Sequence, residues 1–191
     1  MFIKAAEQLG YPATDDFNGE QQEGVGYYQL TVKNGKRWCT ASAYLRPVMD
    51  RPNLTVITGA HASQIEWDGQ RAAGVTYLDS TGTMHRVDAS REVILSGGSF
   101  NSPQLLMLSG VGPDDELKQH NITVKHDLPG VGKNLQEHVD VTILHNAKRY
   151  KGAPHGITLR QSIVDTPSTI NYLLTGKGVL QSHTGEAGGF I

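Results

Sequence analysis

The chain has 191 residues, with 17 Lys and Arg against 19 Asp and Glu and a formal net charge of −2. This balance, without any long basic run, argues against nucleic acid or an anionic membrane surface as a partner. The 38% hydrophobic share is typical of a globular protein. No apolar run approaches the roughly 18 residues that span a bilayer. The single cysteine, Cys39, excludes an intrachain disulfide, and we expect a cytoplasmic or peripherally membrane-associated protein.

The first part of the chain predicts short helices joined by turns. Residues 2–9 are typical of a short amphipathic helix. An alternating run over residues 27–32 predicts a strand, and the Asn34-Gly35 pair after it suits the positive φ of a hairpin turn. Residues 37–45 carry Ala, Tyr and Leu at helical spacing, which predicts a second helix.

From residue 54 the pattern becomes that of β-strands. Residues 54–58 form a compact apolar run that predicts a strand. Three further runs, 61–67, 72–78 and 83–89, are separated by glycine-containing turns. Short strands with such turns predict an antiparallel meander.

A strand, a glycine pair and a helix then follow one another. Residues 92–96 are a nearly continuous apolar strand that leads into Gly97-Gly98. The helix after it is expected to hold Pro103 in its first turn and Leu105, Leu106 and Leu108 on its buried side. α/β proteins hold phosphate or ribose groups at such junctions. The alternative is that the glycines only allow the helix to pack on the sheet.

Periodicity is weaker after residue 124. Residues 171–174 predict a short helix that ends at the glycines 176 and 178. The last six residues, 186–191, are typical of the beginning of a strand. Since a finished domain rarely ends there, we expect the chain to be a piece of a longer protein.

Residues 98–112 read GSFNSPQLLMLSGVG and resemble the second diagnostic motif of the glucose-methanol-choline (GMC) oxidoreductases, a family of FAD-dependent enzymes. Further segments resemble the same family in the same order, so the resemblance covers nearly the whole chain. These segments are residues 35–45, 53–75, 129–138 and 186–191. Two positions depart from the family pattern: Gly97 stands where Ala is usual and Glu137 where Asp is usual.

The resemblance implies a mixed α+β chain of the α/β class. Residues 1–133 would be the middle part of a FAD-binding Rossmann-like domain with an antiparallel β-meander, and residues 134–191 the beginning of a substrate-binding domain. No G-x-G-x-x-G occurs, so the loop that holds the flavin pyrophosphate is expected upstream of residue 1. The catalytic His and its His or Asn partner are expected downstream of residue 191. Such a piece would expose apolar surface and an open sheet edge, which predicts self-association.

The resemblance also implies where the ligands bind. Ala62 matches the position whose backbone reads the adenine edge, and Ser96, Gly97 and Gly98 match small residues that pack against the adenosine portion of FAD. Glu186 is the candidate substrate-binding residue, because in relatives that oxidise choline a carboxylate holds the quaternary ammonium with the help of aromatic faces. The alternative for Glu186 is a solvated charge at the beginning of a strand. We expect no catalytic residue within the chain and no metal site, since the eight histidines form no H-x-x-x-H pair.

Three functions remain open at this point. The first is a fragment, inactive by itself, of a FAD-dependent alcohol (choline-like) dehydrogenase that oxidises a primary alcohol to an aldehyde by hydride transfer to flavin. The second is a non-catalytic scaffold derived from the same family, and the third is a freestanding nucleotide-binding module. The expected partners are FAD and a small-molecule alcohol. The sequence fixes neither the alcohol nor the electron acceptor, oxygen or a quinone-linked carrier.

Overall fold

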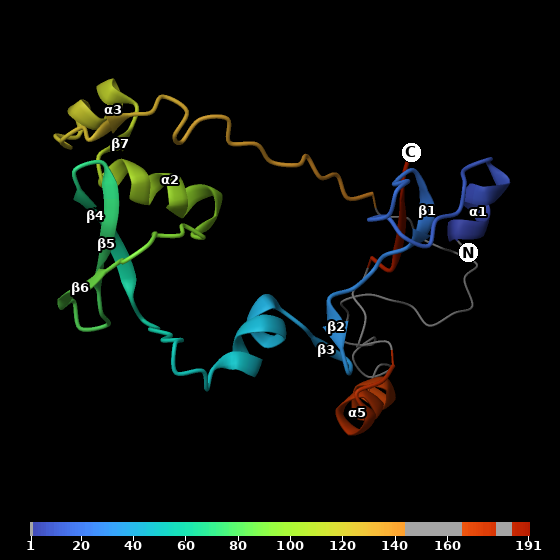
Figure 1. Ribbon diagram of the computed structural model, residues 1–191. Helices are drawn as coiled ribbons and strands as arrows, with labels where there is room; N and C mark the ends of the chain where they lie inside the picture. Colours follow the sequence, from blue (N-terminus) through green and yellow to red (C-terminus); the bar gives the residue numbers. More distant parts are fainter. Residues whose placement is uncertain (1, 144–165, 179–184) are drawn as a thin grey trace. The chain divides into compact units, whose positions relative to one another are not determined.

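The computed structural model describes residues 2–143, 166–178 and 185–191. The chain forms two compact units, one from residues 1–55 with 146–191 and the other from residues 56–145. Figure 1 follows both along the chain. Both units mix helices and short strands, as expected for a mixed α+β chain. The boundary expected between residues 133 and 134 stays a prediction.

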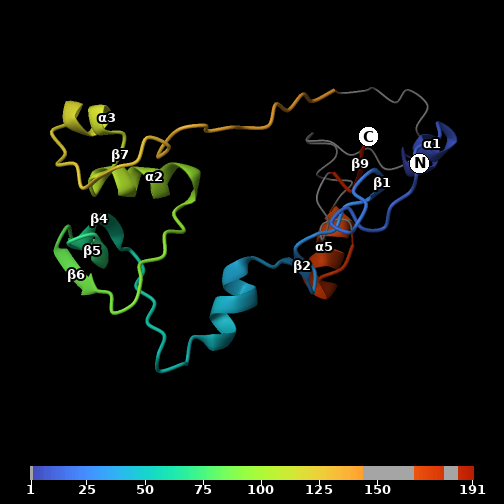
Figure 2. The same cartoon turned by 45° about the horizontal axis from the view of Figure 1, so that its top comes forward.

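The unit of residues 56–145 is built on a three-stranded antiparallel sheet. Strands β4 (His61–Asp68), β5 (Arg71–Leu78) and β6 (Met84–Asp88) pair in chain order, which confirms the predicted meander (Figures 1 and 2). The turns between the strands contain Gly69 at φ 59° and Gly82 at φ 82°. Positive φ costs glycine little, so the hairpin turns follow directly from these residues.

Strand β4 is an irregular edge strand. Its register against β5 shifts between Ala62 and Gln64, and again between Glu66 and Trp67. Bulges of this kind bend a strand and redirect its side chains and backbone groups. Ile65 lies between the two shifts and is 2% exposed, so the irregular strand still contributes to the core.

Helix α2 (Gly98–Leu108) is attached to β4 through Ser109, the residue that follows it. The Ser109 hydroxyl accepts a hydrogen bond from the Ile65 N–H at 2.8 Å and donates one to the Leu105 carbonyl at 2.6 Å. The Ser109 carbonyl accepts a hydrogen bond from Trp67 Nε1 at 2.8 Å. Ser109 is 3% exposed. One buried serine therefore satisfies polar groups of both the helix and the sheet.

Two expectations about α2 are wrong. The helix begins at Gly98, so Pro103 lies inside it rather than in its first turn. Leu105 and Leu106 are only half-buried and Leu108 is 49% exposed, because this side of the helix has little packed against it in the described part of the chain.

The strands predicted over residues 54–58 and 92–96 do not form in this chain. Both segments lack any ladder partner among the described residues. A β-strand needs a neighbour that pairs with its backbone N–H and C=O groups, which apolar composition alone cannot supply. Ile57 and Ile94 are accordingly 51% and 76% exposed.

A small α/β element completes this unit. Strands β7 (Val111–Gly112) and β8 (His126–Asp127) pair in parallel, with helix α3 (Asp114–Gln119) between them in the chain. Leu117 of α3 is 1% exposed and fills the space beneath this pair.

The unit of residues 1–55 and 146–191 begins with helix α1 (Phe2–Gln8), as predicted. Strand β1 (Gly24–Tyr27) pairs antiparallel with β9 (Ala187–Phe190), which confirms a strand near the end of the chain. The strand predicted over residues 27–32 is wrong: β1 ends at Tyr27, β2 begins at Val32, and residues 28–31 belong to no strand. Phe17 and Val25 form the local core, at 6% and 2% exposed.

The other elements of this unit are short. Strands β2 (Val32–Lys33) and β3 (Lys36–Arg37) form a hairpin, and Asn34 at φ 54° and Gly35 at φ 72° confirm its predicted turn. The second predicted helix is reduced to a π-helical turn η1 (Ala41–Leu45), followed by a 3₁₀ turn η2 (Arg46–Val48). Helix α5 (Thr166–Thr175) ends at Gly176, as predicted.

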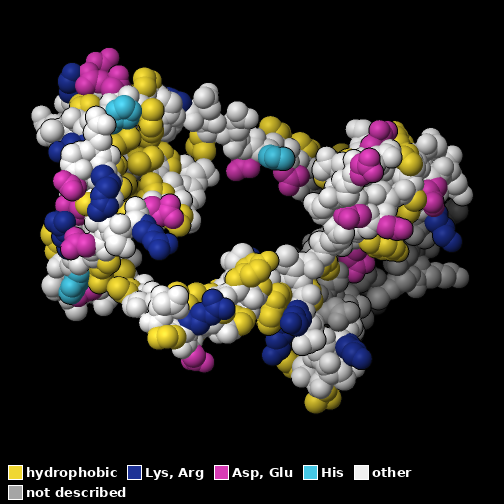
Figure 3. Space-filling model, viewed as in Figure 1, with side chains coloured by type: hydrophobic (Ala, Val, Ile, Leu, Met, Phe, Trp, Pro, Cys, Tyr) yellow, Lys and Arg dark blue, Asp and Glu magenta, His cyan; other side chains and the backbone are white. Residues whose placement is uncertain are grey.

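Many large apolar side chains of the described residues lie at the surface. Phe100 of α2 is 72% exposed, and Leu173 and Leu174 of α5 are 75% and 80% exposed. In the view of Figure 3 apolar side chains gather over α2. Exposed apolar area favours association, so this surface supports the expected self-association, which stays a prediction.

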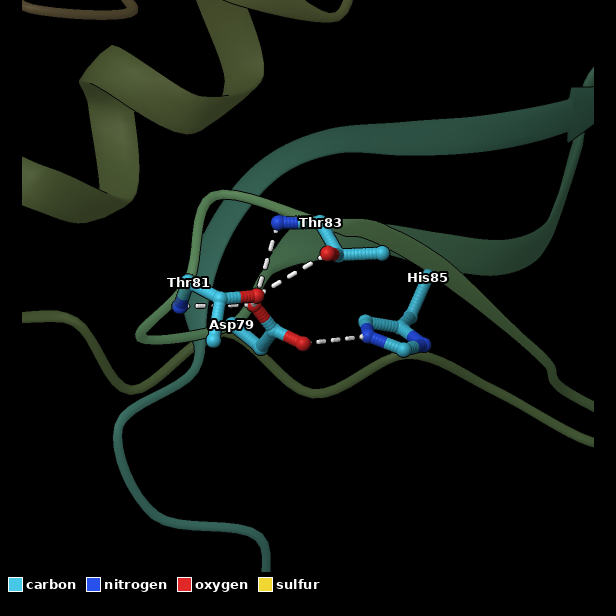
Figure 4. Close-up of polar contacts among 4 residues, drawn as sticks. All are labelled: Asp79, Thr81, Thr83 and His85. Atoms are coloured by element: carbon cyan, nitrogen blue, oxygen red, sulfur yellow. Dashed lines mark hydrogen bonds and ion pairs between the residues drawn. The ribbon is translucent and has the colours of Figure 1, made fainter.

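The turn between β5 and β6 is organised by one carboxylate, Asp79 (Figure 4). Its Oδ1 accepts hydrogen bonds from the Thr81 hydroxyl at 2.6 Å, the Thr81 N–H at 2.8 Å and the Thr83 N–H at 3.0 Å. His85 Nε2 lies 2.7 Å from Oδ2. The Thr81 hydroxyl and then His85 hold the pKa of Asp79 well below its usual range, because hydrogen bonds favour the ionised form.

Substitution of Ser109 tests the attachment of α2. Ser109→Ala leaves the buried Ile65 N–H without its acceptor, so the free energy of unfolding should fall by about 1–3 kcal/mol. Urea unfolding followed by circular dichroism measures it. Ser80→Ala, at an exposed turn position, is the control and should change it by less than about 0.5 kcal/mol. Equal losses in the two variants would contradict the role given to Ser109.

The Asp79 turn predicts a dependence of stability on acid. Since the pKa of Asp79 is lower when folded than its ordinary value of 3.8, its ionised form stabilises the fold above about pH 4. That contribution is lost as the pH falls below this value toward the folded pKa. The unfolding midpoint of the wild type should therefore be higher than that of Asp79→Asn, and this difference should be larger at pH 7 than at pH 3. Asp68→Asn, in the other turn of the meander, is the control; an equal advantage at both pH values would refute the prediction.

Candidate functional site

The candidate site residues fall into two groups, one in each unit. Ser96, Gly97, Gly98 and Ala62 lie in the unit of residues 56–145, and Glu186 lies in the other. Each group is a local arrangement with its own geometry and chemistry.

The first group surrounds the beginning of α2. Ser96, Gly97 and Gly98 are exposed, and no side chain caps the helix. Gly98 has φ 85°, and a Cβ placed on it would meet nothing within 4 Å. The backbone of Gly98 is therefore open to a close approach by a ligand. Unpaired N–H groups at a helix N-terminus attract anionic and polar groups.

Gly97 is more confined than Gly98. Its N–H donates a hydrogen bond to Ser102 Oγ at 3.0 Å. A Cβ on Gly97 would lie 3.1 Å from Asn101 Cβ and 3.3 Å from the Ser102 nitrogen. An alanine at this position would therefore require the first turn of α2 to move by a few tenths of an ångström. Glycine avoids this close contact with Asn101 and Ser102.

Ala62 is the second residue of β4 and pairs with Tyr77 of β5. Its side chain is exposed, and the register shift that follows it interrupts regular pairing at the edge of the sheet. In residues 56–143 no hydrogen bond joins Ala62 to residues 96–98. The structure places the three small residues together at the helix start and Ala62 on the edge strand of the same unit.

Glu186 lines a partly open hollow of about 750 Å³ in the other unit. Tyr27, the last residue of β1, and Tyr28, the next residue, also line it, and Lys177 lies on the segment that follows α5. The Tyr28 N–H donates a hydrogen bond to the Glu186 carbonyl at 3.0 Å, which extends the β1–β9 pairing by one residue. A carboxylate thus lies in the same hollow as two aromatic side chains.

The far wall of this hollow depends on two glycines that approach closely. A Cβ on Gly35 would lie 1.9 Å from the Gly176 carbonyl oxygen, so only glycine fits between the hairpin and α5. The Tyr172 hydroxyl donates a hydrogen bond to the Gly35 carbonyl at 2.7 Å. Lys177 is held by its backbone, since its carbonyl accepts a hydrogen bond from Asn171 Nδ2 at 3.0 Å.

Sequence reasoning missed Tyr27, Tyr28 and Lys177 as neighbours of Glu186. The pairing of β1 with β9 brings the tyrosines to Glu186, and no local pattern predicts such a long-range contact. Gly24 and Gly26 were the available signal of a close backbone approach, because glycine inside a strand often marks one, but they do not identify the partner strand.

The histidines of the described residues form no cluster that could hold a metal ion. His126 is exposed on β8, and His138 is exposed with its N–H donating to Glu137 Oε1 at 2.9 Å. His145, His155 and His183 lie outside the described residues. Within residues 2–143, 166–178 and 185–191, no three His, Cys, Asp or Glu side chains are grouped so as to hold a metal ion.

None of the helices in the described ranges combines the length and the apolar character needed to cross a bilayer.

Comparison with known proteins gives the family. The model of the family described as GMC oxidoreductase matches residues 1–140. The chain is 45% identical over its whole length to "Alcohol dehydrogenase [acceptor]" of Pseudomonas putida, of which it covers 34%. It is 46% identical, again over its whole length, to mitochondrial choline dehydrogenase of Mus musculus, of which it covers 31%.

A solved structure agrees with these matches. A FAD-dependent oxidoreductase from Chaetomium thermophilum superposes with a TM-score of 0.78 at 28% identity, over 94% of this chain and 32% of that one. The chain therefore spans about a third of the length of the curated relatives named above. On these grounds the chain belongs to the GMC oxidoreductase family, a family of FAD-dependent enzymes.

Proposed function

We propose that this chain is the middle part of a FAD-dependent dehydrogenase that oxidises a primary alcohol of the choline type to an aldehyde. The match along the whole chain to an alcohol dehydrogenase and to a choline dehydrogenase, at 45% and 46% identity, carries the proposal. The hollow that contains Glu186, Tyr27 and Tyr28 supports the substrate class.

The unit of residues 56–145 would hold the adenosine portion of FAD. Ser96, Gly97 and Gly98 fit this role, because they are exposed, small and located at an uncapped helix start. Ala62 would offer its backbone to the adenine edge from the irregular edge strand β4. The bound flavin supplies the hydride acceptor, and the chain supplies position and shape.

The other unit would bind the alcohol. The Glu186 carboxylate attracts a quaternary ammonium, in a hollow that Tyr27 and Tyr28 also line. Lys177 lies in the same hollow and offsets part of the negative potential. We infer that the cationic end of the substrate lies toward Glu186, away from the Lys177 ammonium.

The proposal leaves two parts of the site to sequence outside this chain. The loop that holds the flavin pyrophosphate has no counterpart here, and the base that removes the hydroxyl proton is expected beyond residue 191. The chain by itself should therefore be inactive. Localisation, cytoplasmic or peripherally membrane-associated, stays a prediction.

Gly98→Ala tests the cofactor role. A matched control exists in Gly82→Ala: Gly82 has φ 82° against 85° for Gly98, and at both a Cβ would meet nothing within 4 Å. Both variants should lose about 1 kcal/mol of stability from the positive φ. Only Gly98→Ala should also weaken FAD binding by the apoprotein of the complete gene product, by about tenfold, because the methyl group occupies the side from which the cofactor approaches. Equal FAD affinities in a flavin fluorescence titration would remove Gly98 from the cofactor site.

Glu186→Gln tests the substrate role. The ratio of kcat/KM for choline to that for 3,3-dimethylbutan-1-ol, its uncharged analogue, should fall about tenfold, equivalent to about 1.4 kcal/mol. The physical reason is the loss of the charge attraction to the ammonium.

The assay uses the FAD-loaded complete gene product with an artificial electron acceptor. Glu23→Gln, an exposed carboxylate just before β1 that does not line the hollow, is the control and should leave the ratio unchanged. A ratio unaffected by Glu186→Gln would overturn the substrate role, and no oxidation of either alcohol would overturn the proposed function.

A further inference from the structure

The side of β1 and β9 that carries Glu186 also carries a cluster of aromatic rings. The ring centroid of Phe17 lies 5.4 Å from that of Tyr28 and 5.4 Å from that of Phe190. Phe17 is 6% exposed, so it forms a fixed platform between the other two rings. Contacts of this geometry hold the Tyr28 ring in place.

The Tyr28 ring lies directly over Gly188. A Cβ on Gly188 would be 1.9 Å from the Tyr28 hydroxyl oxygen and 2.3 Å from Cζ. Gly188 is buried although it belongs to a two-stranded ribbon. The phenol ring of Tyr28 thus fills the space that a side chain at position 188 would occupy.

Strand geometry places Glu186 beside this ring. Gly26 pairs with Gly188 and the Tyr28 N–H bonds to the Glu186 carbonyl, so Glu186 faces Tyr28 across the ladder. Facing residues of an antiparallel pair point to the same side, with Cβ atoms about 4.5–5.5 Å apart. Glu186 and Gly188, two residues apart in β9 and its approach, share that side as well.

We propose that Tyr28 is a positioning residue for the Glu186 carboxylate, an inference that rests on the proposed substrate role of Glu186. The ring occupies the space above Gly188, into which the Glu186 side chain would otherwise fold back along β9. The conformations left to the carboxylate are those that project into the hollow, which both side chains line. Tyr28 thereby determines the preference for a cationic alcohol through the shape of its ring, and its hydroxyl has no part in it.

The test compares Tyr28 variants in the FAD-loaded complete gene product. The readout is again the ratio of kcat/KM for choline to that for 3,3-dimethylbutan-1-ol. Tyr28→Phe keeps the ring and should keep the ratio. Tyr28→Ala and Tyr28→Leu open the space above Gly188 and should lower the ratio about tenfold, mainly by raising KM for choline. Leucine retains apolar contact with Phe17, so this variant provides a folded protein if alanine does not.

Tyr11→Ala is the matched control. Tyr11 belongs to the same unit, is 38% exposed like Tyr28, and does not line the hollow. Its substitution should leave the ratio unchanged. Gly188→Ala provides a second route to the same effect, because its methyl group displaces the Tyr28 ring. This substitution should lower the ratio when Tyr28 is present. Combined with Tyr28→Leu, it should lower the ratio little further.

The outcomes separate the inference from the proposed function. If Glu186→Gln lowers the ratio and Tyr28→Leu does not, the substrate role stands and the positioning role of Tyr28 is overturned. A lower kcat for both alcohols at an unchanged ratio in Tyr28→Leu indicates a structural role only and also overturns it. If Tyr28→Phe lowers the ratio as much as leucine does, the hydroxyl carries the effect and the proposed mechanism is wrong. If Glu186→Gln leaves the ratio unchanged, the proposed substrate role and this inference fail together.

Discussion

The antiparallel pairing of β1 with β9 is the interaction on which the candidate substrate site depends. It joins segments from opposite ends of the chain, with Gly24 opposite Phe190 and Tyr27 opposite Ala187. Backbone hydrogen bonds fix this register, and a shift by one residue would turn every side chain to the other face. Glycines make the approach feasible, because a Cβ on Gly189 would lie 2.7 Å from Val25 Cγ1 and 2.9 Å from the Gly24 carbonyl oxygen. The pairing thus decides that Glu186 lies opposite Tyr28.

In the unit of residues 56–145 the corresponding constraint is the satisfaction of buried polar groups. Ser109 accepts from the backbone of β4 and from the Trp67 indole, and donates to the carbonyl of Leu105. An unpaired buried N–H is costly, so this serine fixes how α2 crosses the edge of the meander. The beginning of α2, with its exposed glycines, is positioned in turn by an anchor at the other end of the helix. The candidate cofactor residues therefore depend on a side chain outside their own segment.

Both units expose large apolar side chains, and the physical reason is the same in each. Ile57 and Ile94 lie on segments that have no ladder partner in the described part of the chain, and Leu173 and Leu174 of α5 are largely exposed. Apolar runs of this kind become stable strands or buried helix faces only when another layer covers them. This agrees with a chain that spans about a third of its relatives, and it is the reason for expecting self-association when the chain is isolated.

Local residue chemistry by itself determined the meander, its glycine turns, the Asn34-Gly35 hairpin, the helices α1 and α2 and the family, because turn residues and the 98–112 motif act over short distances. It failed at residues 54–58 and 92–96, whose apolar composition does not reveal whether a partner strand is present. The neighbours of Glu186 were decided only by tertiary structure. Tyr28 reaches Glu186 through a ladder between distant segments, and the closing of so long a loop leaves no periodic signal in the sequence.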